Sequence, residues 1–91
     1  MDLNQLRGQI DTIDDALIRL FCKRMDVAAE IAAYKKERGL PILVPAREAE
    51  KLQDAAEKAG PEMAEYVKDF FGTLFRLSRE YQSACNDEVI L

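Results

Sequence analysis

The chain has 91 residues, a length that allows one small domain. Its hydrophobic fraction of 48% and charged fraction of 33% are typical of a globular protein and exclude a disordered one. The net charge of −4 argues against a broad nucleic-acid-binding surface, so any bound anion needs a local cluster of cations. The sequence contains no histidine, and its two cysteines lack metal-ligand spacing, so we expect no metal and no cofactor.

We also expect no targeting signal and no membrane-spanning segment. The residues from Met1 to Gln5 are polar enough that we expect no signal peptide, and no apolar run is long enough to cross a bilayer. We therefore expect a cytoplasmic protein without membrane contact, in which Cys22 and Cys85 are reduced, semi-buried thiols.

The stretch from Leu3 to Arg38 predicts one long helix, since it holds no proline and one glycine. Asp2 with Gln5 resembles a capping box at its start, and Gly39 followed by Pro41 predicts its end. Apolar residues recur in steps of three and four, which is typical of a helix face packed against another helix. These positions are Leu3, Leu6, Ile10, Ile13, Leu17, Leu20, Val27, Ile31 and Tyr34.

A helix of this span is roughly 54 Å long at 1.5 Å per residue. A compact domain of this size has a radius of gyration of only about 12 Å. One chain cannot cover such a helix, so its apolar face needs a second chain, and we predict a homodimer.

The remainder of the chain predicts two further helices. Residues 39–44 form a short apolar connection, and Pro45 fits the first position of a second helix that ends at Gly60 and Pro61. The third helix is expected from about Pro61 to Cys85, with a loose tail over residues 86–91. Without strand alternation, the prediction is a single all-α domain over residues 1–91, with three helices per chain.

Two cations share one face of the first helix. Arg24 interrupts the apolar face, and Lys35 lies three turns later, with Ala28 and Ile31 between them. An arginine among apolar residues is costly unless an anion meets it. Either Arg24 is a buried ion-pair partner and Lys35 is solvated, or the two cations bind an anionic ligand.

Arg7 is a third candidate cation, about 25 Å from Arg24 along the same helix. It cannot join Arg24 in one small pocket of one chain. In an antiparallel helix pair, Arg7 of one subunit can approach the pocket of the other. The alternative is a surface arginine paired with Asp11 or Asp14.

Polar residues on the later helices complete the set. The third helix carries a stripe with steps of four, three and four, formed by Phe71, Phe75, Ser78 and Gln82. Either the Ser78 hydroxyl and the Gln82 amide face one ligand, or both are boundary residues near the helix end. Glu48 either accepts a hydrogen bond from a ligand hydroxyl or simply complements the helix dipole in the first turn of its helix.

These residues describe a binding site for a dianion with a hydroxyl group, and none resembles an activated nucleophile. A reaction that needs neither nucleophile nor histidine base is a rearrangement, accelerated by fixed charges and by holding a folded substrate conformer.

The combination resembles the all-helical class of chorismate mutases over nearly the whole chain. The resemblance is carried by Leu6–Asp11 with Ile13, Asp14 and Leu17, by Arg24 and Lys35, by Arg47–Glu48, and by Ser78 with Gln82. It implies an intertwined homodimer and the Claisen rearrangement of chorismate to prephenate, toward phenylalanine and tyrosine.

The resemblance also implies a role for each site residue. Arg7 would be lent across the interface, and Arg24 and Lys35 would bind the substrate carboxylates. Ser78 would help to hold a carboxylate, while Lys35 and Gln82 would be catalytic by stabilising the ether oxygen.

This chain differs from some members of the family at a position that contacts the ring hydroxyl of the substrate. Some members carry aspartate four residues before the glutamate, where this chain has Val44. The valine side chain cannot form a hydrogen bond, so any contact with the substrate at this position must come from the Val44 backbone. Hydroxyl recognition therefore depends on Glu48. Arg47 is expected to support the pocket charge without being catalytic.

Two alternatives stay open. An isochorismate-pyruvate lyase on the same scaffold would share the cations and the glutamine, and would differ mainly in residues 39–44. A non-enzymatic helical dimerisation or regulatory module would need only the apolar face, and Arg24 within that face argues against it.

Overall fold

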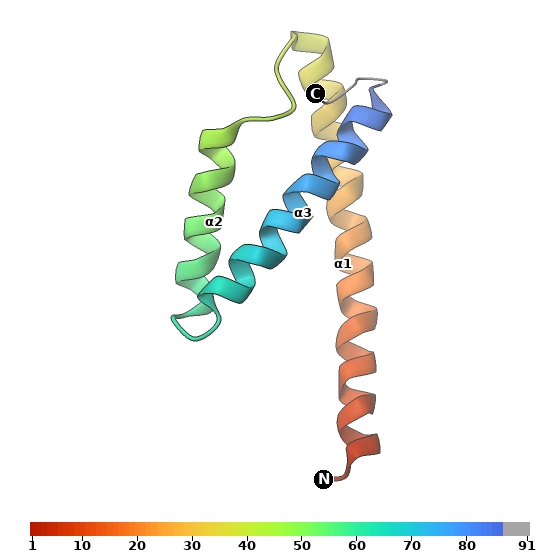
Figure 1. Ribbon diagram of the computed structural model, residues 1–91. Helices are drawn as coiled ribbons and strands as arrows, with labels where there is room; N and C mark the ends of the chain where they lie inside the picture. The colour runs from red at the N-terminus through yellow and green to blue at the C-terminus, as the bar shows by residue number, and fades with distance from the viewer. Residues whose placement is uncertain (87–91) are drawn as a thin grey trace.

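The computed structural model describes residues 1–86, which form three helices and no strand. They are α1 (Leu3–Arg38), α2 (Pro45–Ala59) and α3 (Ala64–Cys85). Helix α3 packs against both α1 and α2, and it runs diagonally from the far end of α2 to the C-terminal half of α1 (Figure 1). The predicted all-α fold with three helices is confirmed.

Helix α1 has the predicted ends. The Asp2 carboxylate accepts a hydrogen bond from the Gln5 backbone N–H at 2.8 Å, and the Gln5 side chain accepts one from the Asp2 N–H at 2.8 Å. This reciprocal pair is a capping box. At the other end, Gly39 takes a left-handed conformation with φ 65°, which a side chain would disfavour.

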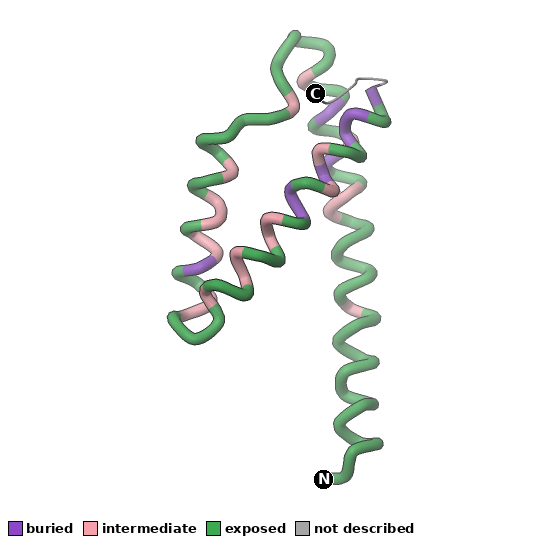
Figure 2. The backbone as a smooth tube through the Cα atoms, viewed as in Figure 1, coloured by how far each residue is buried: buried purple, intermediate pink, exposed green. Residues whose placement is uncertain are grey.

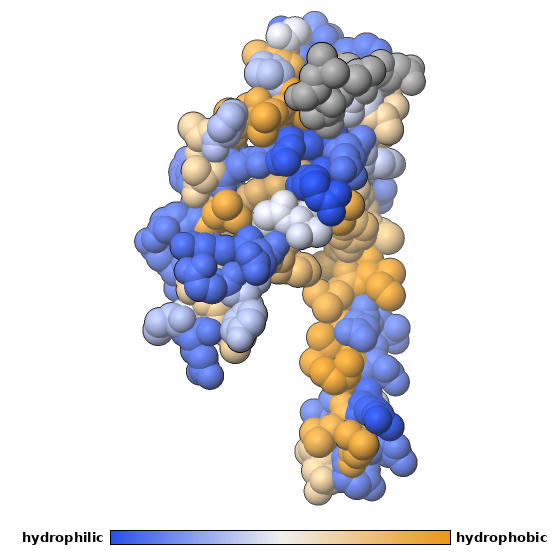
Figure 3. Space-filling model, viewed as in Figure 1, coloured by the Kyte–Doolittle hydropathy of each residue, from blue (hydrophilic) through white to orange (hydrophobic). Residues whose placement is uncertain are grey.

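The N-terminal half of α1 projects away from the rest of the chain (Figure 1). The described molecule is 54 Å long with a radius of gyration of 16.1 Å, well above the value of about 12 Å expected for a compact chain of this length. Apolar side chains cover this projecting half and are exposed, and Figure 3 shows them as a run of orange atoms. They include Leu3, Leu6, Ile10, Ile13, Leu17 and Leu20.

Burial is concentrated where α3 meets its two neighbours (Figure 2). Ala28 and Ala32 of α1 are buried against α3, which buries Leu74 and Phe75. The two alanines let the helix backbones approach closely, and Ala32 is 0% exposed. This small core fixes the C-terminal half of α1 against α3 and leaves the other half uncovered.

The third helix begins later than predicted. Residues 61–63 form a turn rather than helix, and α3 begins at Ala64. The turn is closed by the Met63 N–H, which donates to the Gly60 carbonyl at 3.2 Å, and Gly60 has φ 87°. Pro61 therefore belongs to the connection, and the helical hydrogen bonds start only when the Val67 N–H donates to the Met63 carbonyl.

The expectation of a loose tail is wrong for its first residue. Asn86 is buried, and its side-chain amide donates to the Ala32 carbonyl at 2.8 Å. Its own carbonyl accepts a bond from Lys36 Nζ at 3.3 Å, so the end of α3 is tied to α1. The remainder of the predicted tail, residues 87–91, lies outside the described residues.

Both cysteines differ from the expectation in their exposure. Cys22 and Cys85 are free thiols, as predicted, but both are exposed rather than semi-buried. Among the helices of residues 1–86, none combines the length and the apolarity that a membrane crossing requires.

Candidate active site

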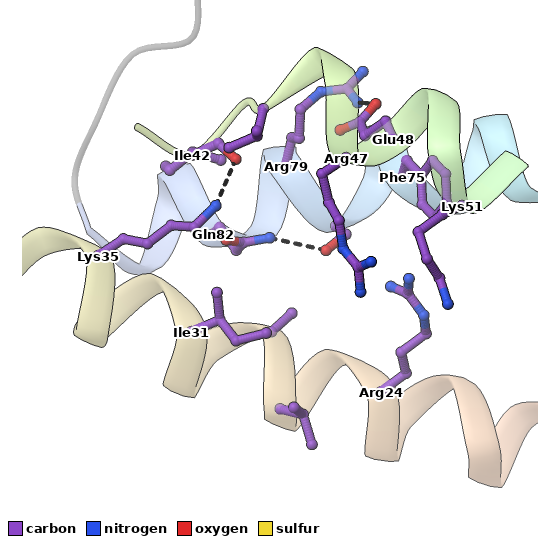
Figure 4. A pocket seen from close by; sticks show the side chains of 14 residues that line it. Arg24, Ile31, Lys35, Ile42, Arg47, Glu48, Lys51, Phe75, Arg79 and Gln82 are labelled. Atoms are coloured by element: carbon purple, nitrogen blue, oxygen red, sulfur yellow. Dashed lines mark hydrogen bonds and ion pairs between the residues drawn. The ribbon is translucent and has the colours of Figure 1, made fainter. Parts of the chain in front are cut away.

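A cavity of about 520 Å³ lies between α1, the start of α2 and the C-terminal half of α3. Its lining comprises Arg24, Val27, Ala28, Ile31, Lys35, Ile42, Val44, Arg47, Glu48, Lys51, Phe75, Ser78, Arg79 and Gln82. The side chains converge from all three helices (Figure 4). Five basic side chains and one carboxylate line it, so this part of an acidic protein favours an anion.

Arg24 enters the cavity from α1. Its guanidinium carbon lies 5.7 Å from the centroid of the Phe75 ring, within cation–π range. No ion pair of Arg24 occurs within residues 1–86, so its forked N–H groups are available to a carboxylate. The buried ion-pair alternative therefore has no support in this chain.

Lys35 lies three turns further along α1, at the opposite end of the cavity from Arg24 (Figure 4). Its ammonium donates to the Ile42 carbonyl at 3.0 Å, which ties the connection between α1 and α2 to the cavity wall. An ammonium group has three N–H donors, so two remain for a ligand.

Ser78 and Gln82 are buried side by side on α3. The amide nitrogen of Gln82 donates to the Ser78 hydroxyl at 3.0 Å, while its oxygen is buried without a partner in the described part of the chain. Burying a polar atom unpaired costs about 1–3 kcal/mol, so the Gln82 oxygen is open to a hydrogen-bond donor from a ligand or a water in the cavity.

Glu48 occupies the first turn of α2, where the helix dipole favours a carboxylate. It forms an ion pair with Arg79 of α3, which also lines the cavity (Figure 4). Arg79 is not among the site residues predicted from the sequence, although it lies four residues after Phe75 and three before Gln82. That spacing places it at the edge of the same helix face.

Two further cations come from α2. Arg47, expected near the pocket, lines the cavity, and so does Lys51, which is not among the predicted site residues. Lys51 lies one turn after Arg47, so the two share a face of α2, but the spacing alone does not show that this face meets the cavity. Lys51 also lies 3.9 Å from Asp54, whose pKa is lowered by its hydrogen bond from Lys58 and by the charges of nearby cations.

Val44 lies at the cavity wall as the N-cap residue of α2. Its carbonyl accepts bonds from the N–H groups of Arg47 and Glu48, at 3.1 and 3.2 Å. Because both lone pairs of that carbonyl are used, a backbone contact to a ligand falls to the Val44 N–H.

Two residues singled out from the sequence, Phe71 and Arg7, lie away from the cavity. Phe71 faces α2 beside Ala55 and Ala59, so the face it shares with Phe75 divides between two packing surfaces. Arg7 lies in the exposed, projecting half of α1, and it forms no ion pair with Asp11 or Asp14 in the described chain. The surface-pair alternative for Arg7 therefore has no support.

Three relatives give the chain its context. It is 40% identical to the T-protein of Enterobacter agglomerans over 96% of its length, and 39% identical to the T-protein of Haemophilus influenzae over 84%. It is 32% identical, over 92% of its length, to the bifunctional chorismate mutase/prephenate dehydratase of Aquifex aeolicus. The chain spans 23%, 21% and 23% of the lengths of these relatives.

The family assignment follows from the length of the match. Residues 6–83 match the family described as chorismate mutase type II. This range contains all three helices except the first residues of α1 and the last of α3, together with every residue that lines the cavity. The chain belongs to the chorismate mutase type II family.

Proposed function

We propose that the chain is a chorismate mutase, an isomerase that converts chorismate to prephenate in the biosynthesis of phenylalanine and tyrosine. The observation that carries the proposal is the buried, half-paired amide of Gln82 in a cavity lined by Arg24 and Lys35. The family assignment supports the same reaction.

The substrate is a dianion, and we assign its two carboxylates to the cations. Arg24 offers the forked donors that suit a carboxylate, and Lys35 offers a compact charge at the other end of the cavity. Ser78 lies within the wall to hold a carboxylate oxygen, and Glu48 accepts the hydrogen bond of the ring hydroxyl.

The rearrangement breaks a carbon–oxygen bond and forms a carbon–carbon bond in one molecule, so it needs no co-reactant. Negative charge grows on the ether oxygen as the bond lengthens, and Lys35 and Gln82 stabilise it more in the transition state than in the ground state. The Gln82 amide nitrogen carries two N–H groups, of which one donates to the Ser78 hydroxyl and the other is left for the ether oxygen. The Ser78 O–H hydrogen then stays free for a carboxylate.

The proposal includes an intertwined homodimer in which Arg7 of each chain completes the cavity of the other. Its support is the exposed apolar face of the projecting half of α1, because contiguous exposed apolar surfaces mark interaction sites. We also propose one helical domain over residues 1–91 and a cytoplasmic location, which two free thiols fit.

The direct test offers the purified chain both chorismate and isochorismate. We expect prephenate from chorismate and no salicylate from isochorismate. Salicylate and pyruvate as the main products would instead identify an isochorismate-pyruvate lyase, and no product from either compound would contradict an enzymatic role.

Replacing Arg24 with Leu separates an enzyme from a dimerisation module. Because Arg24 binds substrate in our proposal, Arg24→Leu should lower kcat/KM by about 10²-fold or more, while the dimer stays folded. Arg19→Leu, on the exposed opposite side of α1, is the control. An Arg24→Leu variant with unchanged turnover would exclude the assigned role.

A further inference from the structure

The ion pair between Glu48 and Arg79 connects two helices at the wall of the cavity. Glu48 comes from the first turn of α2, and Arg79 comes from the C-terminal half of α3. Their side chains are 26% and 23% exposed, so water screens this pair less than it screens the surface pairs of the same helices. Both residues line the cavity, so the pair faces a bound ligand.

The pair changes what the Glu48 carboxylate can recognise. A lone carboxylate attracts a cationic ammonium group more strongly than a neutral hydroxyl group. With the Arg79 guanidinium bound to it, the carboxylate keeps an acceptor oxygen for a hydroxyl, but its negative charge is offset. The adjacent guanidinium also repels a second cation that approaches the same oxygen.

We propose that Arg79 is a positioning residue that sets substrate specificity: through its ion pair with Glu48, it makes the site prefer a ring hydroxyl over a ring ammonium. The inference rests on the proposed function, because it assumes that Glu48 contacts the ring hydroxyl of chorismate. It assigns a role to Arg79 and a preference for a hydroxyl over an ammonium, neither of which the mechanism alone requires.

The expected effect follows from Coulomb's law. A unit charge about 6 Å from a ligand ammonium, at an effective dielectric constant of about 20, changes its binding by roughly a hundredfold. Partial solvent exposure of the pair reduces this effect. We therefore expect the preference for a hydroxyl over an ammonium to change by roughly tenfold to hundredfold.

The experiment compares two substrates, chorismate and 4-amino-4-deoxychorismate, which carries an amine in place of the ring hydroxyl. An aliphatic amine is largely protonated at pH 7. The readout is the ratio of kcat/KM for chorismate to kcat/KM for the amino compound, measured for the wild-type chain and two variants. Arg79→Met removes the guanidinium, and Glu48→Gln removes the carboxylate while keeping a hydrogen-bond acceptor.

The two variants should move the ratio in opposite directions. Arg79→Met leaves the Glu48 carboxylate unpaired, so the ratio should fall by about tenfold or more. Glu48→Gln leaves the guanidinium unpaired, so the ratio should rise. Arg76→Met is the matched control, because Arg76 forms an exposed ion pair with Glu80 on α3, outside the cavity.

If Arg79 only holds α2 against α3, its loss should lower kcat/KM for both compounds by the same factor, and their ratio should not change. An unchanged ratio in Arg79→Met would therefore overturn the inference while leaving the proposed function intact. If Arg79→Met does not fold, as judged by circular dichroism, Arg79→Gln removes the same charge with a polar side chain, and an unchanged ratio in that variant would overturn the inference equally. A wild-type chain that converts neither compound would contradict the proposed function and this inference with it.

Discussion

At the scale of single residues, the cavity shows why helical spacing identifies some site residues and misses others. Arg24, Lys35 and Gln82 were predicted because each breaks or extends an apolar pattern, and all three line one cavity. Lys51 and Arg79 also line it, but each lies among the many charged residues of its helix. Sequence spacing cannot show which charged residues face another helix, because that depends on how α2 and α3 pack.

The amide of Gln82 leads to a prediction about pH. A neutral amide donates without being protonated, whereas a carboxyl group donates only in its acid form, and an ordinary glutamate has a pKa near 4.3. Gln82→Glu should therefore be active at acidic pH and lose activity as the pH rises through the pKa of the new carboxyl group. The measurement is kcat/KM for chorismate from about pH 4.5 to 8.

Gln53→Glu is the control for this profile, because Gln53 is exposed on α2 and lies outside the cavity. Its profile should follow that of the wild-type chain. A Gln82→Glu variant as active at pH 8 as at pH 5 would refute hydrogen-bond donation by residue 82.

At the scale of helices, the ends were predicted where local chemistry decides them. The capping box at Asp2 and the left-handed Gly39 follow from side-chain and backbone preferences within a few residues. The start of α3 was misplaced by three residues, because Pro61 fits both a first helical position and a turn. The packing of Asn86 on α1 depends on contacts 54 residues apart, which a local pattern cannot reveal.

Two glycines, one within α1 and one at its C-terminal cap, should respond to alanine with opposite signs. Gly39 has φ 65°, so Gly39→Ala should lower the free energy of unfolding by about 1–2 kcal/mol. Gly8 lies within the helix with open space around its α-carbon, so Gly8→Ala should raise it by about 1 kcal/mol. Urea unfolding of both variants is the measurement, and a loss of stability in Gly8→Ala would indicate a close neighbour at that position.

The apolar face of α1 should be the surface that joins two chains. Ile13 is 54% exposed in the single chain, and Ile13→Asp should give monomers with little activity, because a carboxylate in an apolar interface is costly. Thr12→Asp introduces the same group about 100° around the helix from Ile13, outside the apolar face, and should leave the dimer intact. Light scattering measures the mass of both, and a dimeric Ile13→Asp variant would place the interface elsewhere.

At the scale of the whole molecule, the single chain is an open shape with one helix half uncovered and one predicted site residue away from the site. The residue count of α1 already predicts a helix too long for a compact chain of this size. The longest extent of the molecule, 54 Å, agrees with that predicted helix length. Arg7 lies in the projecting half of α1, outside the cavity that holds Arg24. A cavity that contains both arginines therefore requires a second copy of the chain, which brings its own Arg7.

Mixing two inactive variants tests this requirement most directly. Arg7→Ala and Arg24→Ala should each be nearly inactive alone. A mixed dimer, formed by refolding the two together, has one cavity with both arginines and one with neither. We expect an equal mixture to recover about a quarter of wild-type activity per chain, since half of the dimers are mixed and each mixed dimer has one intact cavity. No recovery, in a mixture whose exchange of chains is verified by mass, would contradict a cavity shared between two chains.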